Sequence, residues 1–251
     1  MSRSRTIVIG DVHGCLDELD ELLRAVELRP VDRIVLAGDL MDRGPDPAGV
    51  VRRARELGAL AVLGNHEEKH LRWRRHESRR AEDPSYRNPM TPFPDERRAQ
   101  HDALGEDDWH WISALPTWLR LSAAGRRWLV VHAGFEPRWP LKQQNDRIVI
   151  RIREVDDRGK FVSSGDPRVP VEGAVPWATR WRGRESVVYG HHVHALDAPR
   201  VDRHREGVEC WGIDTGCVFG GHLSALVLET REVVQVKALR EDVALDGADL
   251  D

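Results

Sequence analysis

The sequence predicts an α/β fold. Short apolar runs rich in β-branched residues recur along the chain, as is typical of buried strands. Two stretches between the first three runs repeat apolar residues at helical spacing. This order of strand, helix, strand, helix, strand in the first half of the chain predicts parallel strand pairing.

Each element is predicted from its own pattern. The first helix is expected from Leu16 to Val26, where leucines recur at spacings of three and four, and a less regular second helix is expected over 47–57. The predicted strands are Thr6–Ile9, Ile34–Ala37, Leu60–Leu63, Trp128–Val131, Val187–Tyr189, Leu223–Leu228 and Val233–Val236.

The chain is expected to form a single domain over residues 1–240. Residues 69–108 are rich in Arg, Glu, Asp and Pro, which predicts a polar helical insertion. A second excursion is expected over 145–176, with a hairpin pairing Ile148–Val155 with Lys160–Val162 through a turn at Asp157–Gly159. Residues 241–251 form an acidic tail that we expect to be frayed.

Composition excludes several classes of protein. The chain has 251 residues with 38 basic and 42 acidic side chains, so its net charge of -4 does not indicate a nucleic-acid or membrane binder. Cys15, Cys210 and Cys217 have no paired spacing and predict neither a disulfide framework nor a zinc ribbon. No apolar run is long enough for a signal peptide core or a membrane span, and we expect a cytoplasmic protein without a membrane partner.

Polar clusters follow directly after five of the predicted strands. Because the carboxyl ends of parallel strands open onto one edge of a sheet, these clusters should meet. Their carboxylates, amide and imidazoles suit borderline divalent cations, and the adjacent glycines allow tight turns. The clusters are Gly10-Asp11-Val12-His13-Gly14, Gly38-Asp39-Leu40-Met41-Asp42-Arg43-Gly44, Gly64-Asn65-His66-Glu67, His132-Ala133-Gly134 and Gly190-His191.

In this order the five clusters resemble the phosphoprotein phosphatase family of calcineurin-like metallophosphoesterases, whose pattern is GDxHG, GDxxDRG, GNHE, HAG and GH. The resemblance covers about residues 6–230 and is weak in the two excursions. It implies a four-layer α/β/β/α sandwich with two mixed sheets. It also implies two divalent metal ions, expected to be Mn, with Fe, Zn, Co or Ni as alternatives.

The resemblance also implies roles for individual residues. Asp11 and His13 would bind the first metal ion, Asp39 would bridge both ions, and Asn65, His132 and His191 would complete the second site. A hydroxide bridging the ions would attack phosphorus directly, without a covalent enzyme intermediate.

Charge on the phosphoryl group and the leaving oxygen would be stabilised by a cation and a proton donor. The resemblance gives these roles to Arg43 and His66, with Asp42 orienting His66 and Asn65 also contacting phosphate. Arg180 is the candidate for a second phosphate-binding arginine, and Asp214 is expected near the metal ions as a supporting residue.

Simpler interpretations accompany each assignment. Taken singly, each Asp or Asn is typical of a turn or helix cap, and Asp42 with Arg43 would form a surface ion pair. His192 and His194 are expected to be structural, as are the cysteines and the tryptophans. One basic run forms either a solvated helix face or a rim that grips a polyanionic substrate: Lys69, Arg72, Arg74, Arg75, Arg79 and Arg80.

Two substrate classes and one non-enzymatic class follow from this sequence. The first expectation is a hydrolase of phosphomonoesters, similar to protein serine/threonine phosphatases, acting on a phosphoprotein or a small phosphoester. The alternative is hydrolysis of a dinucleoside polyphosphate such as diadenosine tetraphosphate, because diadenosine tetraphosphatases share the same motif set. The segment Ile213–Gly221 resembles the bacterial members, which include both activities. A non-catalytic phosphate-binding scaffold is the third possibility.

Overall fold

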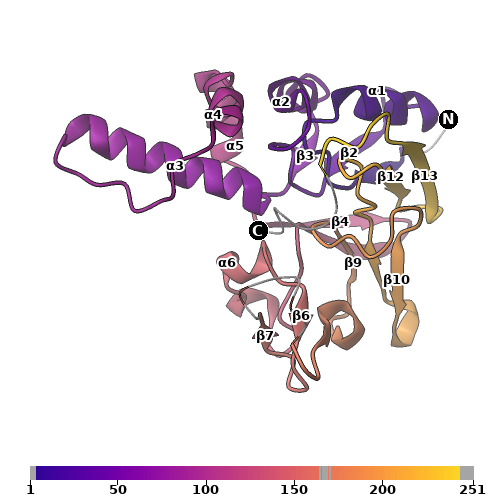
Figure 1. The fold of residues 1–251 in the computed structure, drawn as a ribbon. Coiled ribbons are helices and arrows are strands. Elements are labelled where there is room, and N and C mark those ends of the chain that lie inside the picture. Colours follow the sequence, from indigo (N-terminus) through magenta and orange to yellow (C-terminus); the bar gives the residue numbers. More distant parts are fainter. Residues whose placement is uncertain (1–3, 164, 166–168, 170, 244–251) are drawn as a thin grey trace.

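Two five-stranded sheets face each other across the centre of the molecule (Figure 1). The computed structural model describes residues 4–163, 165, 169 and 171–243. The space between the sheets is filled by apolar side chains from both of them, including Val8, Val35 and Leu226 from one sheet and Trp128 and Val188 from the other. Burial of this shared apolar surface holds the sheets together.

The first sheet has the strand order β13-β12-β1-β2-β3 and is mixed. Its central part is parallel, as the alternation of strands and helices predicts, whereas β12 pairs antiparallel with β1 and β13 antiparallel with β12. The strands are β1 (Thr6–Ile9), β2 (Arg33–Leu36), β3 (Leu60–Ala61), β12 (His222–Val227) and β13 (Glu232–Lys237).

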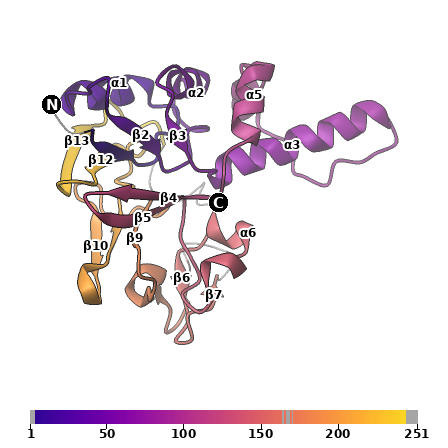
Figure 2. The same ribbon diagram turned by 180° about the vertical axis from the view of Figure 1, so that it is seen from behind.

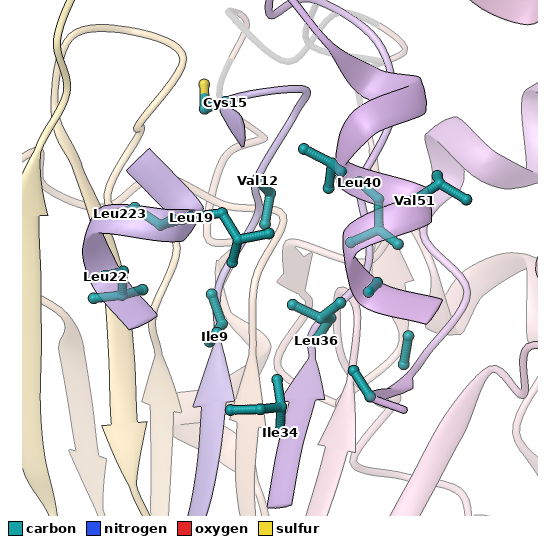
Figure 3. Packing of buried hydrophobic residues seen from close by; sticks show 14 of the residues in the cluster. Ile9, Val12, Cys15, Leu19, Leu22, Ile34, Leu36, Leu40, Val51 and Leu223 are labelled. Atoms are coloured by element: carbon teal, nitrogen blue, oxygen red, sulfur yellow. The ribbon is translucent and has the colours of Figure 1, made fainter. Parts of the chain in front are cut away.

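Two helices, α1 (Leu16–Ala25) and α2 (Pro47–Glu56), cover the outer face of the first sheet. Figure 3 shows Leu19 of α1 and Val51 of α2 directed toward Ile9 and Leu36 on the strands below. The side chain of Asp46 accepts a hydrogen bond from the amide of Gly49, and Pro47 occupies the first turn, so α2 begins with favourable capping chemistry.

The second sheet has the order β10-β11-β9-β5-β4 and is also mixed. Its outer face is covered by the short helix α6, a 3-10 helix and a three-stranded sheet with the order β7-β6-β8. The elements of this half are β4 (Trp118–Ala123), β5 (Arg126–Val131), η1 (Leu141–Gln143), α6 (Asp146–Val149), β6 (Glu154–Val155), β7 (Phe161–Val162), β8 (Val175–Pro176), η2 (Trp177–Arg180), β9 (Ser186–Tyr189), β10 (Arg200–Arg203), η3 (Arg205–Gly207) and β11 (Glu209–Gly212).

The predicted sandwich of two mixed sheets with helices is therefore confirmed, and each predicted strand has a counterpart. The sequence patterns missed β4, the two-residue β8, β10 and β11. Strands β4 and β10 lie at the two edges of the second sheet, where several side chains face solvent and the apolar run is interrupted. The four-residue β11 begins with Glu209 and ends with Gly212, so it also lacks a continuous apolar run.

The hairpin predicted in the second excursion is shorter than expected. Residues Glu154 and Val155 of β6 pair with Val162 and Phe161 of β7, but Ile148 lies in the helix α6 rather than in a strand. The side chain of Asn145 accepts a hydrogen bond from the Arg147 amide and caps that helix. The start of the predicted hairpin strand was therefore wrong.

The polar insertion is helical and leaves the body of the molecule. Helix α3 (Asn65–Glu82) begins at the sheets and extends outward, and the chain returns through α4 (Asp95–Asp102) and α5 (Glu106–Ser113), which stand between α3 and α2 (Figures 1 and 2). The prediction for the acidic tail falls largely on residues 244–251, which lie outside the described residues. Among the described residues, no helix combines the length and apolar character needed to cross a membrane.

The packing against the first sheet predicts a specific loss of stability. Leu36 is 1% exposed beneath α2, whereas Leu60 on the neighbouring strand is 40% exposed. Leu36→Ala should lower the free energy of unfolding by about 2–5 kcal/mol because it leaves a cavity. Leu60→Ala should cost below about 1 kcal/mol. Urea unfolding of both variants tests this, and equal losses would contradict the assigned packing.

Candidate metal centre and active site

The loops after β1, β2, β3, β5 and β9 bring the predicted polar clusters to one place. Two groups of these side chains each bring one potential ligand atom per residue to within 4.8 Å of one another, and Asp39 belongs to both. One group contains His13, Asp39 and His66, and the other contains Asp39, His132 and His191. The position predicted to bridge two ions is thus the residue shared by the two groups.

Backbone carbonyls orient two of the candidate histidine ligands. The Nδ1 atom of His13 is 2.8 Å from the carbonyl oxygen of Met41, and that of His132 is 2.9 Å from the carbonyl oxygen of Ala37. Each ring donates its Nδ1 proton to that oxygen, so Nε2 of the neutral ring carries a lone pair. These Nε2 atoms lie 3.5 and 3.3 Å from Oδ2 of Asp39. Both rings are therefore set to bind a cation.

Buried acceptor atoms at the centre favour a bound cation. Oδ1 of Asp11 is buried without a hydrogen-bond partner, an arrangement that is costly for a carboxylate. Burial raises the pKa of Asp11, and the charges of Asp214 and Asp39 raise it further. Oδ1 of Asn65 lies 2.9 Å from Nε2 of His132. A divalent cation would satisfy these atoms, so the donor set fits the metal ions implied by the sequence.

Electrostatics differ between His132 and His191, the two histidines of the second group. Burial alone would lower the pKa of His132, but the charge of Asp39, the hydrogen bonds to Asp39 and Ala37 and the charge of Glu67 together raise it above its ordinary value. Burial raises the pKa of Asp39, but the charges of His132 and His66 lower it to well below its ordinary value. Burial lowers the pKa of His191, and the positive charge of Arg153 lowers it further. His191 is thereby kept neutral, the form that binds a metal.

Glu67 organises the loop that follows β2. Its Oε1 accepts hydrogen bonds from the amides of Leu40 and Met41, at 2.9 and 3.0 Å. Its Oε2 accepts from the amides of Asp39 and Gly64, at 2.9 and 3.1 Å. The carboxylate is fully buried, so it fixes the backbone on both sides of the centre. No role was predicted for Glu67 from the sequence. It is the third residue of α3, a position typical of a capping residue.

Five site residues other than glycine have a left-handed backbone. Their φ values are 44° for His13, 48° for Asp39, 66° for Asp42, 72° for Arg43 and 67° for His191. Each such conformation costs about 1 kcal/mol or more and persists only where surrounding contacts impose it. The loops are therefore strained at the positions whose side chains face the centre.

Two glycines are required by close approach. A Cβ atom on Gly64 would lie 2.1 Å from Oδ1 of Asp39, and one on Gly190 would lie 1.9 Å from Oδ1 of Asp11. No larger residue fits either position without displacing a candidate ligand.

The predicted proton donor and cation lie beside the centre. Nδ1 of His66 is 2.6 Å from Oδ2 of Asp42, and Nε2 of His66 faces Oδ2 of Asp39 at 3.8 Å. The guanidinium of Arg43 lies 3.0 Å from Nε2 of His13 and stacks over the ring of Phe219 at 5.2 Å. The contact with Asp42 through Nδ1 fixes the orientation of the His66 ring, with Nε2 on the side of the centre.

The remaining predicted residues differ in position. Asp214 is buried, and its pKa is raised to about 6 by burial first and also by the charge of Asp39, so it lies close to the centre. Arg180 ends the 3-10 helix η2, and its Nε has no hydrogen-bond partner in the described part of the chain. The charge that lowers the pKa of His191 belongs to Arg153, which the sequence analysis did not single out. His192 lies beyond the end of β9, and its ring is tilted against that of His194 with 4.1 Å between the centroids.

Comparison with known proteins agrees with this geometry. The family described as calcineurin-like phosphoesterase matches residues 4–223. The chain belongs to the calcineurin-like phosphoesterase family. It is therefore a hydrolase of phosphoesters, in a family that uses divalent metal ions.

Individual relatives cover nearly the whole chain. A symmetrical bis(5'-nucleosyl)-tetraphosphatase of Janthinobacterium sp. (strain Marseille) is 30% identical, covering 92% of this chain and 96% of the relative. The asymmetrical bis(5'-nucleosyl)-tetraphosphatase PrpE of Oceanobacillus iheyensis is 28% identical and covers 94% of each chain. A crystal structure described as a candidate diadenosine tetraphosphatase is 30% identical, with a TM-score of 0.74 over 94% of this chain and 95% of that chain.

The contacts of Glu67 predict the effect of one substitution. Glu67→Gln should lower the free energy of unfolding by roughly 1–3 kcal/mol, because the new amide group faces two backbone amides that then lack an acceptor. The neighbouring Glu68→Gln is the control, since Glu68 pairs with Arg151 at the protein surface and should cost below about 1 kcal/mol. Urea unfolding measures both values. If the two variants lost equal stability, Glu67 would not be the organising residue.

Proposed function

We propose that the chain is a dinuclear-metal hydrolase that cuts a phosphoanhydride bond of dinucleoside polyphosphates. The observation that carries this proposal is that relatives named for tetraphosphatase activity match over 92–94% of this chain and 94–96% of their own length. The substrate that the sequence analysis gave as its alternative is thus better supported than a phosphoprotein or other phosphomonoester.

In this proposal six residues hold the two metal ions. Asp11 and His13 would bind one ion, Asn65, His132 and His191 would bind the other, and Asp39 would contact both. Such a pair supplies a water of lowered pKa as the nucleophile and neutralises charge on the phosphate group. The buried Asp11 oxygen without a partner and the two groups of ligand atoms that share Asp39 support this assignment.

The protein's own residues would act on the phosphate and on the leaving group. Arg43 carries a fixed positive charge beside His13, where it would stabilise charge that develops on the phosphoryl oxygens. His66, oriented by Asp42, would give a proton to the leaving oxygen. Arg153 and Arg180 are the candidates for a further phosphate contact, and the charge that Arg153 exerts on His191 favours Arg153.

The substrate class is tested by comparing three compounds with Mn supplied. We expect diadenosine tetraphosphate to be cut with a higher kcat/KM than a phosphoserine peptide or para-nitrophenyl phosphate. Chromatography of the products then distinguishes symmetrical cleavage to two ADP from asymmetrical cleavage to ATP and AMP. Turnover of the peptide alone would contradict the proposal, and Mn binding without any hydrolysis would instead favour the scaffold hypothesis.

The two-ion assignment has a separate test. Asp39→Asn should reduce bound Mn from two ions per chain toward one or none and lower turnover by roughly 10²-fold or more, because both ions lose a charged ligand. Metal content after gel filtration and turnover are measured on the same preparation. Full metal content together with full activity would show that Asp39 does not bridge the ions.

The role of His66 predicts a dependence on the leaving group. His66→Ala should lower turnover of a substrate with a poor leaving group by roughly 10²-fold or more, while an activated leaving group should suffer less. Steady-state kinetics with phenyl phosphate and para-nitrophenyl phosphate make this comparison. Equal losses for the two esters would argue against His66 as the proton donor.

A further inference from the structure

We propose that the insertion helix α4 positions the proton donor: Arg97 and His101 act through Asp42, the first directly and the second through His70. Asp42 in turn orients His66. Arg97, His70 and His101 are thus positioning residues for the reaction, and this inference rests on the proposed function. In this proposal the polar insertion helps to orient the group that protonates the leaving oxygen.

Asp42 is held at both of its oxygens. Oδ2 receives the hydrogen bond from Nδ1 of His66 at 2.6 Å. Oδ1 lies 2.7 Å from Nε2 of His70 and 3.1 Å from Nε of Arg97. Asp42 is completely buried and lies on a left-handed backbone, so water cannot replace these partners. With both oxygens occupied, the carboxylate has one orientation, which sets that of His66.

The two histidines form a directed chain of hydrogen bonds. Nδ1 of His70 lies 3.1 Å from Nδ1 of His101, and the two rings are stacked at 5.3 Å between their centroids. Burial lowers the pKa of His101 to about 4, and His70 adds to this effect, so His101 is neutral near pH 7. One of the two Nδ1 atoms donates to the other, while His70 donates from Nε2 to Asp42, so the chain of hydrogen bonds leads from His101 through His70 to Asp42.

Other contacts hold α4 against the same loop. Nε2 of Gln100 donates to the carbonyl oxygen of Gly44 at 3.2 Å, two residues beyond Asp42. Ala103 is the C-cap residue of α4, and its carbonyl oxygen accepts a hydrogen bond from the side chain of Arg52 on α2. Helix α4 is thus fixed to the loop after β2 at a point separate from the histidine chain.

His70 itself is placed by the helix that carries His66. The two residues are four apart on α3, so their side chains share one face of that helix. The rings of Phe93 and Trp109 pack around His70, at 4.9 and 6.3 Å between centroids. Asp42 therefore lies between His66 and His70 of one helix and the side chain of Arg97 from another.

The test compares neighbouring arginines of α4. Arg97→Ala removes a contact to Asp42. The control Arg98→Ala removes an exposed pair with Asp102 and a contact with the ring of Trp73, neither of which involves Asp42. With Mn, Arg97→Ala and His70→Leu should lower turnover of phenyl phosphate by about 10- to 100-fold and of para-nitrophenyl phosphate by under about threefold. Arg98→Ala should change neither, and His70→Gln, which keeps a donor for Asp42, should recover most of the loss.

Proton NMR of the zinc-loaded protein gives a readout independent of turnover. The His66 and His70 ring protons bound to Asp42 should appear as downfield resonances that are absent in Asp42→Asn. In Arg97→Ala the His66 resonance should broaden through faster exchange with water, whereas in Arg98→Ala it should persist.

Two outcomes would overturn the inference: equal losses for both esters in Arg97→Ala, or a His66 resonance unchanged in both Arg97→Ala and His70→Leu. If His70→Leu does not fold, Arg97→Ala decides alone. If the wild type cuts neither aryl ester, the NMR result decides the positioning role. The diadenosine tetraphosphate assay judges the proposed substrate separately, so the two failures are distinguishable.

Discussion

The centre depends first on one buried carboxylate that belongs to neither group of candidate ligands. Glu67 accepts hydrogen bonds from four backbone amides, and three of these amides belong to consecutive residues of the loop after β2. That loop then supplies the carbonyl oxygen of Met41 to His13 and the carbonyl oxygen of Asp39 to the amides of Val12 and His13. Protein hydrogen bonds therefore join the loops after β1, β2 and β3 into a single unit.

Such a unit is needed because the centre gathers charges that repel one another. Asp11, Asp39 and Asp214 are all buried close together, and the pKa of both Asp11 and Asp214 is raised. A flexible set of loops would relieve this repulsion by moving apart. The two tightly packed sheets prevent that movement. A bound cation would relieve the repulsion between the carboxylates, and this relief would add to the affinity of the centre for cations.

The sequence was informative where function is concentrated in short segments. The five polar clusters follow buried strands, and the parallel order of β1, β2 and β3 predicts that the first three meet. The strands β5 and β9 lie in the second sheet, so the meeting of all five depends on how the two sheets pack, and the metal roles of these residues stay predictions. Arg97 and His101 could not be predicted in the same way, because they lie 55 and 59 residues from Asp42 in a polar stretch without a periodic pattern. Their contact depends on how α4 packs. Edge strands such as β4 and β10 were missed for a related reason, since solvent-facing side chains obscure their alternation.

The left-handed residues of the centre bear on how such chains diverge. At His13, Asp39 and His191 glycine would adopt the backbone more easily, so a side chain is retained there only while it is useful. A relative released from catalysis would gain stability by mutating these positions to glycine or asparagine. The identity of the residues at these few turns therefore indicates whether a descendant of this fold still performs chemistry or has become a binding protein.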